Sequence, residues 1–448
     1  MKKIITLLAA AGMVVAASAP ASAVDVKVDY RHRISFTSSS ENFTGQNLEQ
    51  AKNRVRLGLT LAASENLKGY TQFQLLHNKQ FGEIGSTHGD NDITVRQMYI
   101  DWTVPTTAVK VRMGRMEMGL PVDAFGENAV MAAGYGSRDG VVVTAPVTDW
   151  LSLTALWNRT NYGAWNNGED PEGTKFKSAH DLDNNSSDDI YALVANMKFN
   201  GVSGSVYAAY ATLDKDFLTY KKTTSSHNPS NGSTLPTFEG NAYWLGFTST
   251  ISMFDPFVLK LSAAYGEASD SNGADFGQKG WNVQAKASYK MDFGTPVFGA
   301  WYFSGDDKDE NVKGSMPTVT GAFTPIRMYH DAGKGLNVLT GHETPVGNWG
   351  VQLGIEKVSF LKDLSHDFFV SYVAGTNDQE LVKDQKKTNY LGDEDAFVAF
   401  TLTNTYQIYK NLAAHLEMIY IVNEFETADR PAMTEDDWGV ELTFEYKF

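Results

Sequence analysis

Alternation of apolar and polar residues with a period of two runs through most of this sequence of 448 residues. In residues 438–448 every second residue is apolar, from Trp438 to Phe448, and residues such as Glu441 and Thr443 stand between them. A period of two places the apolar residues on one face of a strand and the polar residues on the other. We therefore predict an all-β fold. The same pattern recurs in residues 26–36, 54–61, 281–291 and 349–356.

The connections between these segments are short and long in turn. Residues 200–201 and 410–411 have the composition of tight turns, whereas residues 160–188 and 305–347 are long and polar. This rhythm is typical of a transmembrane antiparallel β-barrel, which has tight turns at one end and long loops at the other. Counting the segments gives about 18 strands of membrane-spanning length, and one hairpin fewer would give 16.

A soluble β-sandwich is the alternative explanation of the alternation. Two observations favour the barrel. The apolar faces carry aromatic residues at their ends, such as Trp281 and Tyr289, as the interfacial girdles of membrane barrels do. A sandwich protein of this length would also need several domains, and no segment has the composition of a linker.

The N-terminal 23 residues have the composition of an export signal. Lys2 and Lys3 precede an apolar stretch at residues 4–17, and Ala21-Ser22-Ala23 is typical of a signal-peptidase site. We predict a signal peptide at residues 1–23 and a single barrel domain at residues 24–448. An exported barrel belongs in the bacterial outer membrane, in contact with its lipid and lipopolysaccharide.

Three short stretches resemble bacterial outer-membrane porins. Residues 111–115 resemble the strand that leads into the constriction loop of general porins, and residues 123–127 resemble the acidic segment of that loop. The N-terminal region is most similar to the homotrimeric porins of sulfate-reducing bacteria. The resemblance implies a homotrimer and an inward-folded third loop that carries Asp123 and Glu127. The third stretch is the C-terminus, where Phe448, Tyr446 and Phe444 resemble the signal that the outer-membrane assembly machinery reads.

The polar strand faces predict the lining of the channel. A Lys or Arg at the lipid midplane costs about 2–4 kcal/mol, so the charged faces must point inward. Facing rows of opposite charge, basic on the strands and acidic on the third loop, would create a transverse field at the constriction. The alternative is that these charges are solvated or pair with one another. Parity places Arg96 and Arg115 outward, unless a β-bulge shifts their register. The predicted basic lining residues are Arg31, Arg33, Arg54, Arg56, Lys110 and Arg112.

Several kinds of site are not indicated. The motifs of nucleotide-binding, zinc-protease and serine-hydrolase sites do not occur, and the sequence has no cysteine. His415 and Glu417 share a strand face, which is weak evidence for a hydrolase. The acidic segment near residues 181–192 has Ser186 and Ala192 where a calcium loop needs Gly and Glu. We expect no enzyme activity, cofactor or metal centre, although divalent cations could bind the acidic loops. A net charge of −15 opposes nucleic-acid binding.

These features favour a passive diffusion channel for small hydrophilic solutes and ions. A substrate-specific outer-membrane channel and a non-conducting surface or adhesin barrel are the alternatives. A substrate-specific channel would need an inward aromatic track, and most aromatic residues are predicted on the lipid face. The acidic loops favour cations at the mouth, whereas the basic lining acts in the opposite direction. Weighing the two, we expect a slight preference for cations.

Overall fold

The computed structural model describes the chain from Val24 to the C-terminus, with gaps. The predicted signal peptide at residues 1–23 lies outside the described residues. Within the described part, no helix is both long and apolar enough to cross a bilayer. The described residues are 24–37, 48–80, 93–133, 137–160, 188–213, 240–270, 277–307, 312–319, 321–323, 325–326, 347–380, 391–424 and 436–448.

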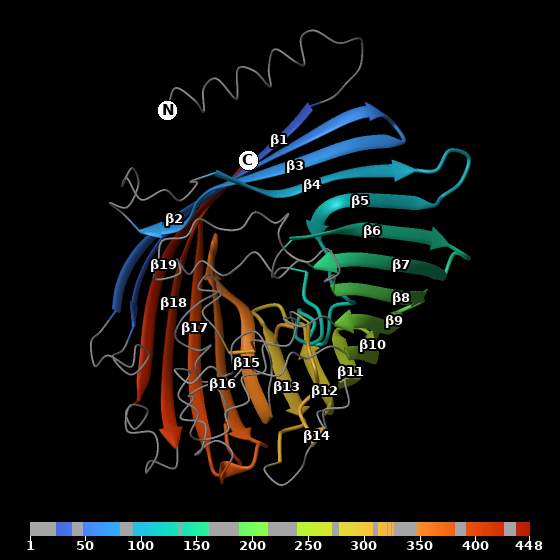
Figure 1. Ribbon diagram of the computed structural model, residues 1–448. Helices are drawn as coiled ribbons and strands as arrows, with labels where there is room; N and C mark the ends of the chain where they lie inside the picture. Colours follow the sequence, from blue (N-terminus) through green and yellow to red (C-terminus); the bar gives the residue numbers. More distant parts are fainter. Residues whose placement is uncertain are drawn as a thin grey trace, which may run out of the picture.

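The described residues form nineteen strands in one sheet (Figure 1). They are β1 (Val24–Thr37), β2 (Leu48–Ser64), β3 (Leu67–Gln80), β4 (Ile93–Thr103), β5 (Lys110–Glu117), β6 (Ser137–Pro146), β7 (Leu151–Thr160), β8 (Asp188–Phe199), β9 (Val202–Leu213), β10 (Gly240–Phe254), β11 (Phe257–Asp270), β12 (Gly277–Tyr289), β13 (Thr295–Phe303), β14 (Val312–Lys313), β15 (Asn348–Leu361), β16 (Leu364–Gly375), β17 (Ala396–Tyr409), β18 (Leu412–Glu424) and β19 (Asp437–Lys447).

The sheet closes on itself as a barrel. Each long strand pairs antiparallel with its neighbours in sequence, and β1 pairs with β19 from Asp29–Lys447 to Thr37–Gly439. The two-residue strand β14 pairs parallel with the start of β12 and lies apart from this wall. The wall of the barrel therefore has eighteen antiparallel strands, which confirms the predicted all-β barrel and the count of 18 over 16.

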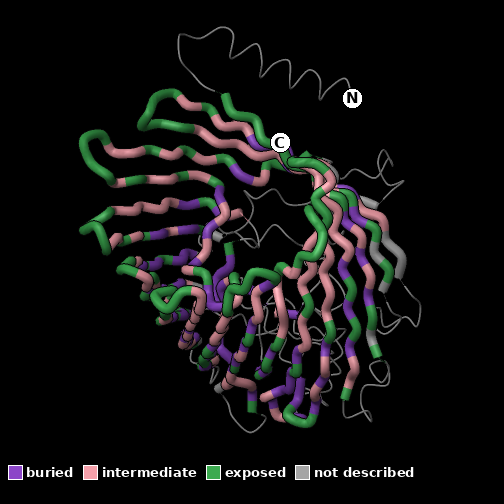
Figure 2. Tube along the Cα trace, turned by 180° about the vertical axis from the view of Figure 1, so that it is seen from behind, coloured by how far each residue is buried: buried purple, intermediate pink, exposed green. Residues whose placement is uncertain are grey.

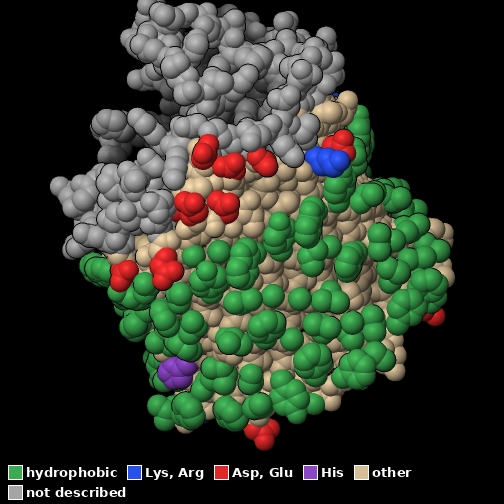
Figure 3. Space-filling model, turned by 90° about the horizontal axis from the view of Figure 1, so that it is seen from below, with side chains coloured by type: hydrophobic (Ala, Val, Ile, Leu, Met, Phe, Trp, Pro, Cys, Tyr) green, Lys and Arg blue, Asp and Glu red, His purple; other side chains and the backbone are tan. Residues whose placement is uncertain are grey.

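The predicted alternation corresponds to an outward and an inward face. On β12, Trp281 is 44% exposed on the outward face, whereas Gln284 on the inward face is 1% exposed. Phe444, Tyr446 and Phe448 of the predicted assembly signal lie exposed on the outward side of the last strand. Figure 3 shows hydrophobic side chains spread over one outward face, with most of the charged ones toward one edge. An apolar belt of this kind is what a lipid-facing wall requires.

The inside of the barrel has two unlike halves, which the sequence analysis did not foresee. The inward faces of β7–β13 are largely apolar and buried, and they include Trp244 and Trp301. The loop-side ends of β16–β18 add buried apolar side chains such as Phe397. We call this side the packed wall. Figure 2 shows buried residues concentrated on this side and on the chain folded inside the barrel. Most aromatic side chains of these strands still lie on the outward face, as expected, and Trp244, Trp301 and Phe397 are inward exceptions.

Candidate functional site: a charged passage

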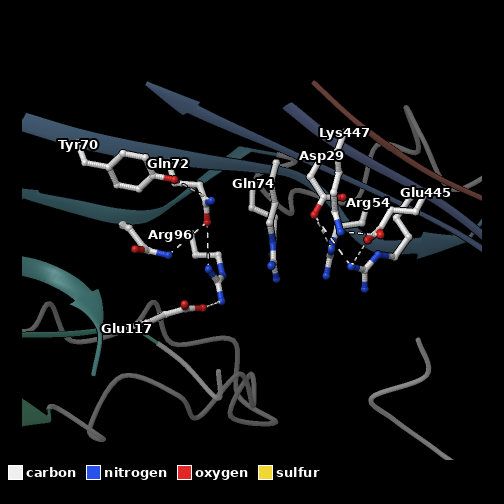
Figure 4. Close-up of polar contacts among 12 residues, drawn as sticks. Asp29, Arg54, Tyr70, Gln72, Gln74, Arg96, Glu117, Glu445 and Lys447 are labelled. Atoms are coloured by element: carbon white, nitrogen blue, oxygen red, sulfur yellow. Dashed lines mark hydrogen bonds and ion pairs between the residues drawn. The ribbon is translucent and has the colours of Figure 1, made fainter. Parts of the chain in front are cut away.

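The inward faces of β1, β2 and β4 carry a cluster of guanidinium groups. We define the arginine wall as Arg31, Arg33, Arg54, Arg56 and Arg96. Four of them were predicted from strand parity. Figure 4 shows this region, with Arg54 and Arg96 pointing away from the strands that carry them.

Carboxylates on β1 and β19 balance part of this charge. Arg31 Nη2 contacts Glu445 Oε1 at 2.6 Å. Arg54 Nη2 lies 3.2 Å from Asp29 Oδ2. These pairs arise from register, because Arg31 stands opposite both Glu445 and Arg54 across its two neighbouring strands. The part of the arginine wall nearest to β19 is therefore largely neutralised.

Farther along β1 toward Thr37, Arg33 forms a buried pair with Glu441 of β19. Arg33 Nε lies 3.4 Å from Glu441 Oε2, and neither side chain is more than 7% exposed. Glu441 also stands opposite Glu417 of β18 in register. A buried charge of this kind is held in place by its partner, because an unpaired one would be strongly destabilising.

Arg56 differs from its neighbours in its partner. Its Nε donates to the neutral amide oxygen of Gln74 at 2.8 Å. Arg56 also borders a recess of about 510 Å3, which Lys27, Lys447 and Asp29 line as well. A guanidinium has five N–H donors in a fork that matches a carboxylate. This recess therefore combines three cationic side chains with one carboxylate.

A β-bulge brings Arg96 to the inward side. The pairing of β3 with β4 shifts between Gln72–Gln97 and Phe73–Val95, so Arg96 is the extra residue. Val95 and Met98 point outward on either side of it. Arg96 Nη1 donates to Gln72 Oε1 at 2.9 Å, and its Nη2 pairs with Glu117 at the end of β5. Simple parity places Arg96 outward, and only the stated exception, a bulge, gives the observed position.

The other predicted basic residues lie apart from the arginine wall. Arg112 forms a bidentate pair with Asp101, at 2.6 and 2.8 Å, and its guanidinium lies 4.2 Å from the centre of the Tyr99 ring. Lys110 is exposed at the first residue of β5. Arg115 points outward, as parity predicts, and contacts Asp139 at 3.1 Å.

The third loop folds into the barrel, as the resemblance implied. Asp123 is 7% exposed and accepts hydrogen bonds from Gln284 Nε2 at 2.9 Å and from the backbone N–H of Phe125 at 3.0 Å. Burial raises the pKa of Asp123 from 3.8 to about 7. Glu127 is half-buried in the same turn, and its carbonyl accepts from the Asp123 N–H. Asp123 thus faces the packed wall and fixes the loop to it.

A second inward segment, described at residues 314–319, 321–323 and 325–326, packs on the third loop. The Val319 N–H donates to the Val130 carbonyl, and the Ala322 N–H donates to the Asn128 carbonyl. Phe125 meets Phe323 and Trp301 edge to face, each at 5.4 Å between ring centres. Sequence analysis missed this segment because it treated residues 305–347 as one polar loop. The apolar residues Met316, Phe323 and Ile326 were the available signal.

The remaining predicted residues show no catalytic arrangement. His415 Nδ1 lies 3.0 Å from Thr405 Oγ1, and Glu417 is buried on the same inward face. Among the residues that the structure describes, no three His, Cys, Asp or Glu side chains are grouped to hold a metal ion. The acidic segment at residues 181–187 lies outside the described residues.

Comparison with solved structures shows the same fold in outer-membrane proteins. The outer membrane protein OpdK of Pseudomonas aeruginosa matches with a TM-score of 0.53 and 12% identity, over 95% of this chain and 99% of that chain. OccK9 (OpdG) of the same organism matches at 0.56 and 13%, over 95% and 98%. OccAB2 of Acinetobacter baumannii matches at 0.55 and 12%, over 95% and 98%. Neither a protein-family model nor a curated protein matches the sequence.

Proposed function

We propose that the chain is an outer-membrane channel that selects small anionic solutes, with carboxylates as the expected class. The observation that carries the proposal is the position of Arg56, which borders a recess with Lys27 and Lys447 and has a neutral partner in Gln74. An anion that contacts Arg56 gains a charge-assisted hydrogen bond at a guanidinium that donates to a neutral amide. Lys27 and Lys447, by contrast, already pair with Asp25 and Glu445. Rings of basic side chains favour anions in channels, so the proposal reverses the slight preference for cations that the acidic loops suggested.

The two inward segments support selection by size and charge. They fill the side of the barrel next to the packed wall, which leaves the passage beside the arginine wall. A solute there meets guanidinium groups on one side and Glu117 at the end of β5. The predicted roles of Arg31, Arg33, Arg54 and Arg56 as pore lining belong to this proposal. That of Glu127 does so as well, whereas Lys110 and Arg112 lie apart from the arginine wall and outside the proposed path of the anion.

The comparison supports the substrate-specific alternative more than the general diffusion channel. One solved structure of similar fold is that of Pseudomonas aeruginosa OpdK with vanillate, an aromatic carboxylate. A vanillate-sized anion is therefore a reasonable first probe for this chain. A general diffusion channel, as the sequence analysis favoured, is the second candidate, because the barrel has enough strands to hold an aqueous lumen.

The test is block of single-channel current in a planar bilayer. Added vanillate should interrupt the current of the purified protein, whereas vanillyl alcohol, its uncharged analogue, should not. Replacing Arg56 by Gln should weaken the block about fivefold, since a contact between unit charges in water is worth about 1 kcal/mol. Arg112→Gln is the matched control. An open current that neither probe interrupts would favour the general diffusion channel, and a barrel that conducts no current would refute both.

We also propose assembly as a homotrimer, in line with the resemblance to homotrimeric porins. The outward-facing pair of His32 and Asn53, with 2.5 Å between Nδ1 and Oδ1, supports it, because polar side chains on a lipid face suit protein contact better than lipid. Native mass spectrometry should give three copies, and a monomer would contradict the proposal. Removal of Phe448 should impair insertion if Phe444, Tyr446 and Phe448 form the assembly signal.

A further inference from the structure

The outward face of β6–β9 carries an open apolar groove, whose strands belong on their inward side mostly to the packed wall. Its volume is about 510 Å3. Val143, Ala155, Leu193 and Ala208 line it and stand opposite one another across the four strands. The two alanines lower the surface between larger neighbours. Leu193 is strongly exposed, so the groove opens outward.

An aromatic row borders this groove on the side of the long loops. Trp157, Tyr191 and Tyr210 stand opposite one another on β7, β8 and β9, two residues nearer to the loops than the row that includes Ala155. Tyr191 and Tyr210 are exposed on the outward face. Trp and Tyr at such positions typically lie at the level of the lipid headgroups. The row therefore marks the boundary between acyl chains and headgroups.

A charged row stands two residues farther toward the loops. Register places Arg115, Asp139, Arg159 and Asp189 opposite one another on β5, β6, β7 and β8. Arg159 holds Asp189 through Nε at 2.9 Å and Nη2 at 2.8 Å, and its guanidinium lies 5.8 Å from the centre of a ring of Trp157. The side chains of Arg115 and Arg159 are 45% and 48% exposed, whereas that of Asp189 is 12% exposed.

The three rows match an amphiphile with an anionic head. The groove and its aliphatic lining suit an acyl chain, and the half-exposed guanidinium groups keep N–H donors for a phosphate. Asp139 pairs with Arg115, and Asp189 pairs with Arg159. These two carboxylates orient the guanidinium groups and leave their other N–H donors for the phosphate. Basic side chains at the edge of a membrane wall bind lipid headgroups.

We propose that this outward face of β5–β9 is a binding site for the phosphorylated lipid of the outer leaflet, the lipid A part of lipopolysaccharide. One acyl chain lies in the groove over Ala155 and Ala208. A phosphate contacts Arg115 and Arg159. The site is independent of transport, because all of these residues lie on the outward side of the barrel.

The experiment measures binding of purified lipid A to the delipidated, folded protein by native mass spectrometry. The double variant Arg115→Gln/Arg159→Gln should lose affinity about tenfold or more. Ala208→Phe, which fills the groove, should weaken binding as well. Dephosphorylated lipid A should bind the wild type and the double variant equally. The matched controls are Ala263→Phe and Lys279→Gln, which lie on the outward face of other strands and should bind lipid A like the wild type.

Three results would overturn the proposal. One is lipid A binding that neither the arginine variant nor the groove variant changes. Another is equal loss in the matched controls, which would indicate non-specific contact with the belt. The third is a change of oligomeric state in Ala208→Phe with unchanged lipid binding, which would assign the groove to a second copy of the chain. Folding of each variant is checked by its electrophoretic shift on heating.

Discussion

The two halves of the barrel interior have the same backbone architecture but opposite chemistry, since one is packed with apolar side chains and the other carries guanidinium groups. The packed wall buries Trp244, Trp301 and Phe397 in an apolar cluster that includes residues of the two inward segments. The arginine wall holds Arg54, Arg56 and Arg96 in a polar, partly paired cluster. The difference teaches that an inward position in a wide barrel has no fixed chemistry. What covers it decides whether the residue is core or lining.

The largest expected effect on stability comes from removing a large side chain from the packed wall, which should leave the arginine wall unchanged. Trp301→Ala should destabilise the folded barrel by about 3–5 kcal/mol, because a buried aromatic leaves a cavity. Trp301 also contacts Phe125 and Phe323, so both inward segments should loosen. Urea unfolding in detergent, followed by electrophoretic shift, measures the loss.

The matched control for this change is Trp281→Ala on the outward face of the neighbouring strand. Its side chain is 44% exposed and gives up less buried surface. It should also leave the single-channel current steady, whereas Trp301→Ala should make the current noisier. Equal effects from the two variants would show that the inward segments do not depend on this packing.

A second way to test the packed wall is pH. The pKa of Asp123 is raised from 3.8 to about 7 by burial, so the folded loop holds a proton that the unfolded chain releases within this range. The unfolded state then binds fewer protons, and stability should fall by a few kcal/mol as pH rises from about 4 to 7. Unfolding midpoints at several pH values measure this slope.

Asp123→Asn should flatten that pH dependence, since the amide cannot ionise. Glu65→Gln, at an exposed turn, should leave the slope as in the wild type. An unchanged slope in Asp123→Asn would mean that the charge of Asp123 is accommodated without cost.

The smallest expected effect belongs to Arg112, which lies outside both halves of the comparison. Arg112→Lys loses the bidentate contact with Asp101, but both side chains are about 40% exposed. The expected loss is below about 1 kcal/mol in urea unfolding. A loss of unfolding free energy as large as that of Trp301→Ala would show that the pair of Arg112 and Asp101 stabilises the barrel more than its exposure suggests.

The sequence predicted the barrel well because alternation is a local property of each strand. The eighteen strands, the outward faces of β12 and β19, and the inward arginines of β1 and β2 all follow from parity. Register across distant strands is not local, which is why the pairing of Arg31 with Glu445 could not be read from the chain. The bulge at Arg96 also depends on how β3 and β4 pair.

The packed wall was the part that sequence reasoning missed. Its strands alternate small or aromatic inward residues with apolar outward ones, so hydropathy alone does not identify the inner face. The carboxylate of Asp123 is a related case. Its type and position on the third loop suggested a charge facing the passage, whereas the tertiary contacts with Gln284 and Phe125 turn it toward the packed wall.

The most direct test of the central claim is the reversal potential of the purified protein in a planar bilayer under a potassium chloride gradient. We predict a potential whose sign indicates anion preference, reduced toward zero in Arg56→Gln and retained in Arg112→Gln. A wild-type preference for cations, or a preference for anions that Arg56→Gln leaves unchanged, would contradict the assignment of the arginine wall as the selective element.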